Sequence, residues 1–295
     1  MTEAKRTMAP EHDLISLEDL MFADIEALVE RAEALAIAGR DLPQSLSGIR
    51  AALIVNDGGW RNTSAFELGV VRMGGHCVRV PLVLGTREAT EDVAAYLDNW
   101  FDIIIARAPD LSLLRDLATA ARAPVINART RQNHPCEILG DLAFYWHHHH
   151  RLAGIKVVVV APEANILGSW FELSRVAPIN VVQLYPEAWH AAYSEGGRFR
   201  VSTDMGELKD ADIIVTDCWP TDAADILLPY QITSDVLDTL GVNAEFIPCP
   251  PVTRGQEVSA DAMVHPRCRA TEAKDFLLHV QNAVLEWTLG RLRFG

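Results

Sequence analysis

Short β-branched runs alternate with segments of helical periodicity along most of the sequence, and this alternation constrains the fold more than any other feature. In the first half, strands are expected at 51–56, 77–81, 102–106 and 125–127, with helical segments near 64–73, 89–99 and 110–121. Parallel strands need crossover connections of a dozen or more residues, which helices usually supply. The first half is therefore predicted to form a parallel sheet with helices on its faces.

An amphipathic helix is expected before the first of these strands. Ser16 followed by Asp19 gives a start that resembles a capping box, and apolar residues then recur at helical spacing as far as Gly39. The chain is therefore predicted to open with one long helix.

A second alternating set follows a break in the pattern at 152–154. Its strands are expected at 155–161, 180–184, 212–216 and 244–247, and its helices at 165–176 and about 231–240. Further helices are expected at 134–149 and about 272–289. We therefore predict an α/β protein with two doubly wound parallel-sheet domains, residues 1–150 and 151–271, joined by interdomain helices, with a C-terminal helix in 272–295 that packs back on the first domain.

Size and charge limit the classes of partner. A chain of 295 residues is about right for two domains of ordinary size, and no stretch approaches the roughly 18 apolar residues of a membrane-spanning helix. The formal net charge is −14 and no basic stripe opposes it, so neither nucleic acid nor a membrane is expected as a partner. An anionic ligand would have to be held by individual arginines and backbone amides.

The cysteines and histidines do not predict a metal site. The five cysteines are scattered and form no CxxC pair, which argues against both a disulfide framework and a zinc site. The run His147 to His150 lies on a predicted helix, where only His147 and His150 are neighbours. No metal or other cofactor is expected. The first ten residues lack the apolar segment of a secretory signal, so a cytoplasmic location is expected.

The loop after the first predicted strand is a candidate anion site. It runs from Asn56 to Glu67, contains Gly58 and Gly59, and leads into a helix at Arg61. Ligands of open α/β sheets collect at the carboxyl ends of strands, where helix N-termini favour anions. Taken alone, however, a glycine turn before a helix is more often only a turn.

Several motifs in the first half occur in a recognisable order. Phe66-Glu67 and Met73-Gly-Gly-His76 match the SFE and LGGH of one family, in which an STRTR loop precedes them. Ile103–Arg107 resembles a strand whose terminal arginine holds carbamoyl phosphate, while 125–130 and 134–142 resemble VINGLT and HPCQ-ILADL. On these residues the chain resembles the aspartate/ornithine carbamoyltransferases.

The second half narrows the resemblance to the ornithine branch. Thr216–Trp219 resembles TDVW, Tyr230–Thr233 resembles GYQVT, and Pro248–Val258 resembles HCLPxxRGEEV. The similarity covers essentially residues 13–290. It implies that the first domain binds carbamoyl phosphate, that the second binds an amino acid, and that the protein is a homotrimer.

The resemblance also implies roles for individual residues. It assigns carbamoyl phosphate to three arginines and a histidine, namely Arg61, Arg107, His134 and Arg254. Asn165 and Asp217 would hold the α-carboxylate and α-amino groups of the acceptor, and Cys249 would lie beside the reacting amine. Taken singly, these residues also have structural interpretations: a solvated arginine, a histidine at a helix start, or a small buried thiol.

The differences from the family pattern are concentrated in these same motifs. The STRTR loop is replaced by five candidate substrate-binding residues, Gly59, Trp60, Arg61, Asn62 and Thr63, with the loss of two hydroxyls and one cation. The glutamine of HPCQ is Glu137, whose carboxylate would repel a phosphate unless it were protonated or paired. The SMG tripeptide is replaced by 221–223, GDxNN by 161–165, and a glutamine that the family lends to a neighbouring subunit by Val83.

Three hypotheses follow. The leading one is an enzyme that transfers a carbamoyl or related one-carbon group to or from an amino compound other than ornithine. A second is an enzyme that cleaves or transfers an amidino or ureido group without carbamoyl phosphate, which Glu137 and Trp60 favour. A third is a homologue that binds ligand without catalysis, which the lost hydroxyls, the missing SMG and Val83 favour.

Overall fold

The computed structural model describes residues 12–55, 58–193 and 198–292. The first half contains one four-stranded parallel sheet in the order β2-β1-β3-β4. Its strands are β1 (Arg50–Ile54), β2 (His76–Val80), β3 (Ile103–Arg107) and β4 (Val125–Arg129). The connecting helices are α2 (Trp60–Arg72), α3 (Thr90–Trp100) and α4 (Leu111–Ala120). The predicted alternation is thus confirmed for this half.

The second half contains a five-stranded parallel sheet in the order β7-β6-β5-β8-β9. Its strands are β5 (Lys156–Val160), β6 (Asn180–Leu184), β7 (Phe199–Ser202), β8 (Ile213–Thr216) and β9 (Glu245–Pro248). Its helices are α6 (Asn165–Val176), α7 (Ala224–Leu227) and α8 (Ser234–Asp238), with 3-10 turns at η2 (Glu187–Trp189), η3 (Met205–Leu208), η4 (Leu228–Tyr230) and η5 (Ala262–Val264).

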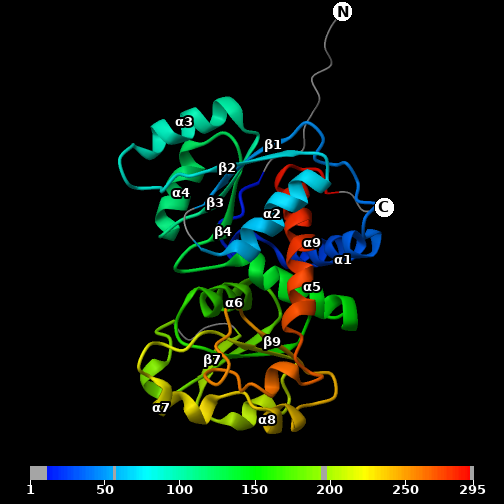
Figure 1. Cartoon of the computed structure of the whole chain (residues 1–295), viewed down its shortest axis with the longest axis vertical. Coiled ribbons are helices and arrows are strands. Elements are labelled where there is room, and N and C mark those ends of the chain that lie inside the picture. Colours follow the sequence, from blue (N-terminus) through cyan, green and yellow to red (C-terminus); the bar gives the residue numbers. More distant parts are fainter. Residues whose placement is uncertain (1–11, 56–57, 194–197, 293–295) are drawn as a thin grey trace, which may run out of the picture.

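Three long helices pack against one another: α1 (Phe22–Ala38), α5 (Pro135–His149) and α9 (Ala270–Thr288). Figure 1 shows α5 between the two halves, with α9 rising beside it from the second half to the first. α9 packs against α1, α2 and α5. Its approach to α2 requires a glycine, since a Cβ on Gly69 would lie 2.0 Å from Asn282 Oδ1.

A buried ion pair also fixes α9 against α1. Arg31 of α1 donates to both carboxylate oxygens of Glu286, over 2.6 and 2.9 Å. Ser45 Oγ donates to the same carboxylate over 2.6 Å. Glu286 is fully buried, so these donors supply the partners that a buried charge needs.

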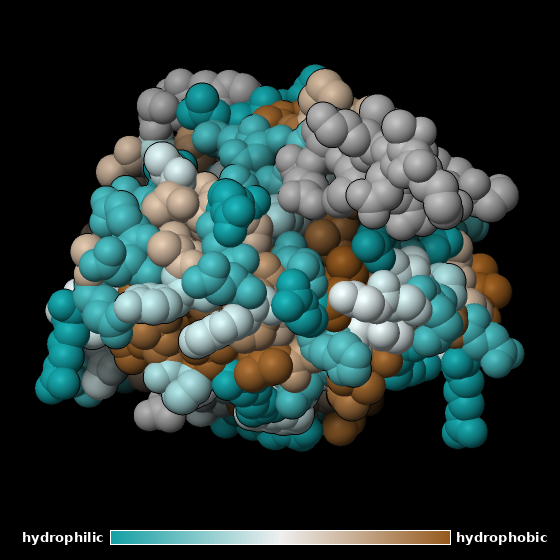
Figure 2. All heavy atoms as spheres, turned by 90° about the horizontal axis from the view of Figure 1, so that it is seen from above, coloured by the Kyte–Doolittle hydropathy of each residue, from teal (hydrophilic) through white to brown (hydrophobic). Residues whose placement is uncertain are grey.

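Apolar burial explains why the β-branched runs became strands. Ile103 to Ala106 and Val157 to Val160 are buried on both faces, as expected for central strands of a parallel sheet covered by helices. Each buried Val, Leu or Ile side chain contributes about 1.5–3 kcal/mol relative to exposure. Seen from above, hydrophilic side chains cover much of the surface, with apolar patches between them (Figure 2).

Some expected elements differ in the structure. The capping box of Ser16 and Asp19 closes only a 3-10 turn, η1 (Leu17–Asp19), and the first α-helix begins separately at Phe22. The helix expected at 231–240 is reduced to the five residues of α8, since Gln231 is extended and Thr233 caps the helix start. Strand β7 was not expected. None of the described helices is long and apolar enough to span a membrane.

Candidate active site

The topology brings most of the predicted site residues to the carboxyl ends of the strands. Gly59 follows β1, Arg107 ends β3, and His134 follows β4 and precedes α5. On the second sheet, the residues at the corresponding ends are Asn165 after β5, Asp217 after β8 and Cys249 after β9. Strand ends of this kind are where open α/β sheets bind ligands.

Arg107 lies against the glycine turn that precedes α2. Gly59 adopts a left-handed conformation (φ +68°), and a Cβ there would lie only 2.1 Å from Arg107 Nη1. The arginine is 8% exposed, and its Nε has no hydrogen-bond partner among the described residues. Burial lowers the pKa of Arg107, the charge of Arg129 lowers it further, and Glu137 partly opposes both. Gly59 therefore provides the space in which a buried guanidinium faces the turn.

His134 is held in place through its backbone, which leaves its ring available. Its N–H donates to Ser169 Oγ over 2.8 Å, and its Nδ1 is buried with no partner in the described part of the chain. Its Nε2 lies 3.9 Å from Glu137 Oε2. Burial lowers the pKa of His134 to about 4, although Glu137 acts in the opposite direction. The imidazole is therefore neutral near pH 7 and can donate one hydrogen bond to a ligand oxygen.

A buried amide network sets the loop before His134. Asn133 Oδ1 accepts from Asn127 Nδ2 and Thr130 Oγ1, both over 2.7 Å. Asn133 Nδ2 donates to Glu172 Oε1 on α6 over 2.8 Å, which ties this loop to the second half. Burial raises the pKa of Glu172 to about 7, against the hydrogen bonds that it accepts. The network therefore carries a carboxylate that titrates near neutral pH.

Glu137 is paired with Lys274 of α9, which is one of the two conditions under which its carboxylate would not repel a phosphate. Lys274 Nζ lies 2.7 Å from Glu137 Oε1 and 2.7 Å from Asp141 Oδ1, and all three side chains are nearly buried. Burial would raise the pKa of Glu137, but Lys274 and His134 overcome this and lower it. Burial raises the pKa of Asp141 to about 6 despite Lys274. Sequence reasoning missed Lys274, since only the packing of α9 on α5 reveals it.

Cys249 lies next to this cluster. Its Sγ is 3.9 Å from Glu137 Oε1, and the residue is 6% exposed. Burial raises the pKa of Cys249 well above its ordinary value, and Glu137 and Asp217 raise it further. The group is therefore a neutral thiol, which argues against a role as a nucleophile.

The two predicted acceptor residues lie on the second sheet. Asn165 Nδ2 donates to Thr130 O over 3.2 Å, so this amide group already bridges the two halves. Asp217 Oδ1 accepts from the N–H of Cys218 over 2.8 Å. Burial raises the pKa of Asp217, although Arg129 opposes the rise.

The other candidate residues at the start of α2 differ in their exposure to solvent. Thr63 Oγ1 lies 3.3 Å from Gly59 O and Trp60 O, so this hydroxyl closes the helix start, and the Asn62 side chain is buried. Trp60 and Arg61 are exposed, with the guanidinium carbon 4.7 Å from the indole centroid. Both line an apolar groove of about 570 Å³ between α2, α9 and residues 248–252, which Lys274 also lines.

Arg254 is not joined to the other predicted phosphate ligands. It lies in an exposed turn, and no hydrogen bond or ion pair between described residues connects it with Arg107 or His134. Its charge acts on Cys268, whose pKa is raised by burial and lowered in part by Arg254.

Arg129 is a second residue that sequence reasoning missed. It occupies the position of the leucine in VINGLT, and that substitution was the available signal. A register shift between β3 and β4 places Arg129 beside Arg107 in the ladder. Arg129 is exposed and forms no ion pair within the described ranges.

The histidine run distributes its rings among different carboxylates. His147 Nδ1 lies 2.9 Å from Glu33 Oε1, and His150 Nδ1 lies 3.7 Å from Glu33 Oε2, which confirms that these two share a side of the helix. His149 instead contacts Glu245 at 3.1 Å. No group of three potential metal ligands occurs in the part of the chain that the structure describes.

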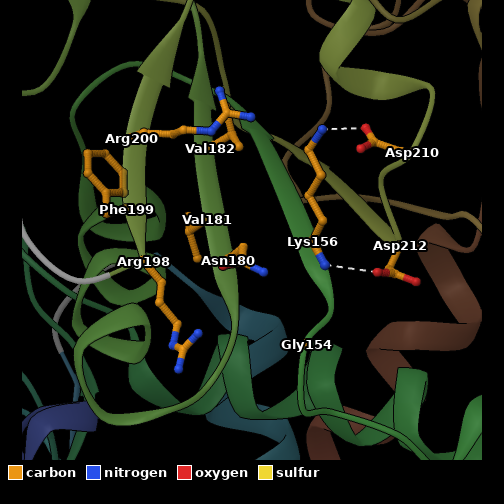
Figure 3. A pocket seen from close by; sticks show the side chains of 10 residues that line it. All are labelled: Gly154, Lys156, Asn180, Val181, Val182, Arg198, Phe199, Arg200, Asp210 and Asp212. Carbon is orange, nitrogen blue, oxygen red and sulfur yellow. Dashed lines mark hydrogen bonds and ion pairs between the residues drawn. The ribbon is translucent and has the colours of Figure 1, made fainter.

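A hollow of about 580 Å³ lies at the opposite end of the second sheet, at the amino ends of β5 and β6 (Figure 3). Lys156 pairs there with Asp210, and its N–H donates to Asp212 over 2.8 Å. Arg200 pairs with Glu207. Because the charges of Lys156 and Arg200 are already paired, the hollow is a weaker candidate than the strand ends.

Comparison with known families accounts for this arrangement. The model of the aspartate/ornithine carbamoyltransferase carbamoyl-P binding domain matches residues 12–147, and that of the Asp/Orn binding domain matches residues 153–288. The chain belongs to this family. The predicted family and fold class are thereby confirmed, and the family and its relatives indicate a carbamoyltransferase.

Individual relatives of similar sequence and structure are also carbamoyltransferases. The ornithine carbamoyltransferase of Chlorobaculum tepidum is 32% identical over 254 residues, 79% of this chain and 75% of the relative. That of Deinococcus radiodurans is 27% identical over 300 residues, 95% of this chain and 97% of the relative. The crystal structure of ornithine carbamoyltransferase from Burkholderia thailandensis has a TM-score of 0.88 at 27% identity, covering 95% of this chain and 99% of that one.

Proposed function

We propose that this protein transfers a carbamoyl or closely related one-carbon group between carbamoyl phosphate and an amino compound other than ornithine. The observation that carries the proposal is that a buried Arg107 guanidinium and a neutral His134 lie at adjoining strand ends, each with a buried nitrogen that lacks a partner among the described residues. Leaving such buried groups unpaired costs about 1–3 kcal/mol each, so a ligand with several oxygens would be favoured there.

These groups suit carbamoyl transfer. Attack of a neutral amine on the carbamoyl carbon forms a C–N bond and places negative charge on the carbonyl oxygen. The bond to phosphate oxygen then breaks, and phosphate leaves with the electron pair and takes up the proton that the attacking nitrogen loses. Arg107 and His134 would donate hydrogen bonds to the developing charge, and Arg61 and Arg254 would attract the phosphate. The neutral thiol of Cys249 would contact the substrate without forming a covalent bond to it.

The proposal of an acceptor other than ornithine rests on the second half of the site. The relatives are named ornithine carbamoyltransferases, but here the segments 161–165 and 221–223 depart from the motifs that resemblance assigns to ornithine. Arg129 adds a cation beside Arg107 that has no ion-pair partner among the described residues. That cation disfavours an acceptor with a second ammonium group.

Glu137 supports the amidino alternative less than its sequence suggested. A cationic amidine would pair with a free carboxylate, but Lys274 Nζ already lies 2.7 Å from Glu137 Oε1. The alternative therefore requires the substrate to displace an internal ion pair. The non-catalytic alternative keeps the support of the lost loop hydroxyls.

The domain bounds, the oligomeric state and the cellular location are proposed from the resemblance to the family. We propose a carbamoyl phosphate domain at 1–150, an amino acid domain at 151–271 and the returning helix at 272–295, since α9 packs on α1, α2 and α5. We also propose a cytoplasmic homotrimer. Exposed apolar side chains on the first half support association, namely Trp60, Leu68, Val71, Val78 and Val83.

Phosphate release in the presence of carbamoyl phosphate and a panel of amines tests the function. We expect saturable release and a ureido product with an amine other than ornithine. Preferred use of ornithine would refute the proposed acceptor class, and no release with any amine would favour the non-catalytic alternative. Glu137→Gln distinguishes the amidino alternative from carbamoyl transfer. The amidino alternative requires a carboxylate at position 137, so it predicts that the variant has a changed substrate choice.

A further inference from the structure

Arg129 occupies the junction between the two halves of the candidate site. At the end of β4 it lies level with Arg107, because the ladder skips Ala128. Bulges of this kind re-aim side chains and are frequent beside active sites. The next residue, Thr130, accepts a hydrogen bond from Asn165 through its carbonyl group, over 3.2 Å. Arg129 therefore adjoins both the proposed phosphate half and the proposed acceptor half.

The charges around Arg129 leave its guanidinium available. Lys274 is occupied by Glu137 and Asp141, and Arg107 is buried against the Gly59 turn. Arg129 is exposed and unpaired within the described residues, although the chain as a whole carries a net charge of −14. Its charge also acts on residues of both halves. It lowers the pKa of His134 in the first half, and it lowers the pKa of Asp217 in the second half, where burial raises that pKa more strongly.

We propose that Arg129 binds a carboxylate of the acceptor amine and so determines which amines this site accepts. The proposal rests on the proposed transferase function and adds to it a residue that selects among acceptor amines. The planar guanidinium fork matches a carboxylate with two parallel hydrogen bonds, whereas an apolar side chain at this position offers none. Asp217, on the neighbouring sheet, remains available for the acceptor's ammonium group.

Amines that differ only by a carboxylate test the proposal. Suitable pairs are L-ornithine with 1,4-diaminobutane and L-aspartate with β-alanine, measured by calorimetry with and without carbamoyl phosphate. The variants are Arg129→Leu and Arg129→Lys. Arg131→Leu is the control, because Arg131 is exposed nearby and pairs with Asp110 at the surface.

We expect Arg129→Leu to weaken binding of the more carboxylated member of at least one pair by tenfold or more. Binding of its partner and of carbamoyl phosphate should change less than twofold, and Arg129→Lys should be intermediate. The proposal is wrong if Arg129→Leu behaves like Arg131→Leu, or if the wild type binds carbamoyl phosphate but none of the carboxylated amines. If the wild type fails to bind carbamoyl phosphate, the proposed function is refuted instead. Amine binding measured without carbamoyl phosphate would then still test whether Arg129 binds the carboxylate.

Discussion

Replacing Lys274 with methionine should destabilise the protein strongly and in a pH-dependent way. Lys274 Nζ lies 2.7 Å from carboxylates of both Glu137 and Asp141, and the three side chains are 12%, 8% and 1% exposed. Removing one member of a buried ion pair costs about 3–5 kcal/mol, because the remaining charge is left without compensation. We expect a loss of that size for Lys274→Met at pH 8.

The loss should shrink as the pH falls. Burial raises the pKa of Asp141 to about 6, so this carboxyl group is largely protonated at pH 5 and depends less on the lysine. Without Lys274 the pKa of Asp141 should rise further, and that of Glu137 should rise from its lowered value. Their protonation then removes the uncompensated charge, so the variant should recover part of its stability relative to wild type at pH 5.

Equilibrium urea unfolding at pH 8 and pH 5 measures both effects. The control variant is Lys209→Met, which removes an exposed lysine and should cost less than about 0.5 kcal/mol. The triple variant Glu137→Gln, Asp141→Asn, Lys274→Met leaves no charge in this cluster and should regain most of the loss. The reasoning is refuted if Lys274→Met matches Lys209→Met at pH 8, or if the triple variant is no more stable than the single one.

Three further predictions concern the strand ends and the loop before α5. Gly59→Ala should weaken carbamoyl phosphate binding at least tenfold by calorimetry, because the new Cβ would displace Arg107; unchanged affinity would contradict the close approach. The pKa of Glu172 is about 7 in the folded state and 4.5 in the unfolded state, so the free energy of unfolding of the wild type falls as the pH rises through 7. Glu172→Gln cannot titrate, so melting experiments at pH 5 and 8 should show this pH dependence reduced by up to ~3 kcal/mol. A difference independent of pH would oppose this. Cys249→Ala should retain measurable phosphate release, since the thiol is protonated, and complete loss would point to a covalent role.

The sequence predicted the architecture well because strand burial leaves a direct pattern. The helix at 165–176 and the strand at 180–184 were located at their observed bounds. Strand β7 was missed because its sequence, Phe199 to Ser202, includes a charged residue and is only four residues long. The Ser16–Asp19 capping box was identified correctly but assigned to the wrong helix, since local capping cannot show whether a turn continues.

The site was predictable to the extent that it follows from topology. Arg107, His134 and Cys249 lie at strand ends, where the alternation of elements places them. Lys274 could not be found this way, because its contact with Glu137 joins positions 137 residues apart through helix packing. Arg129 was visible only as an arginine in place of a motif leucine, and its position beside Arg107 depends on a register shift that no sequence pattern specified.

Calorimetric titration with carbamoyl phosphate tests the central claim most directly. Wild type should bind it saturably, and Arg107→Ala and Arg61→Ala should each weaken the affinity at least tenfold. Arg115→Ala, an exposed arginine on α4, should match wild type. Absence of binding to wild type, or equal affinity in Arg107→Ala and Arg115→Ala, would contradict the proposal that these strand ends form a carbamoyl phosphate site.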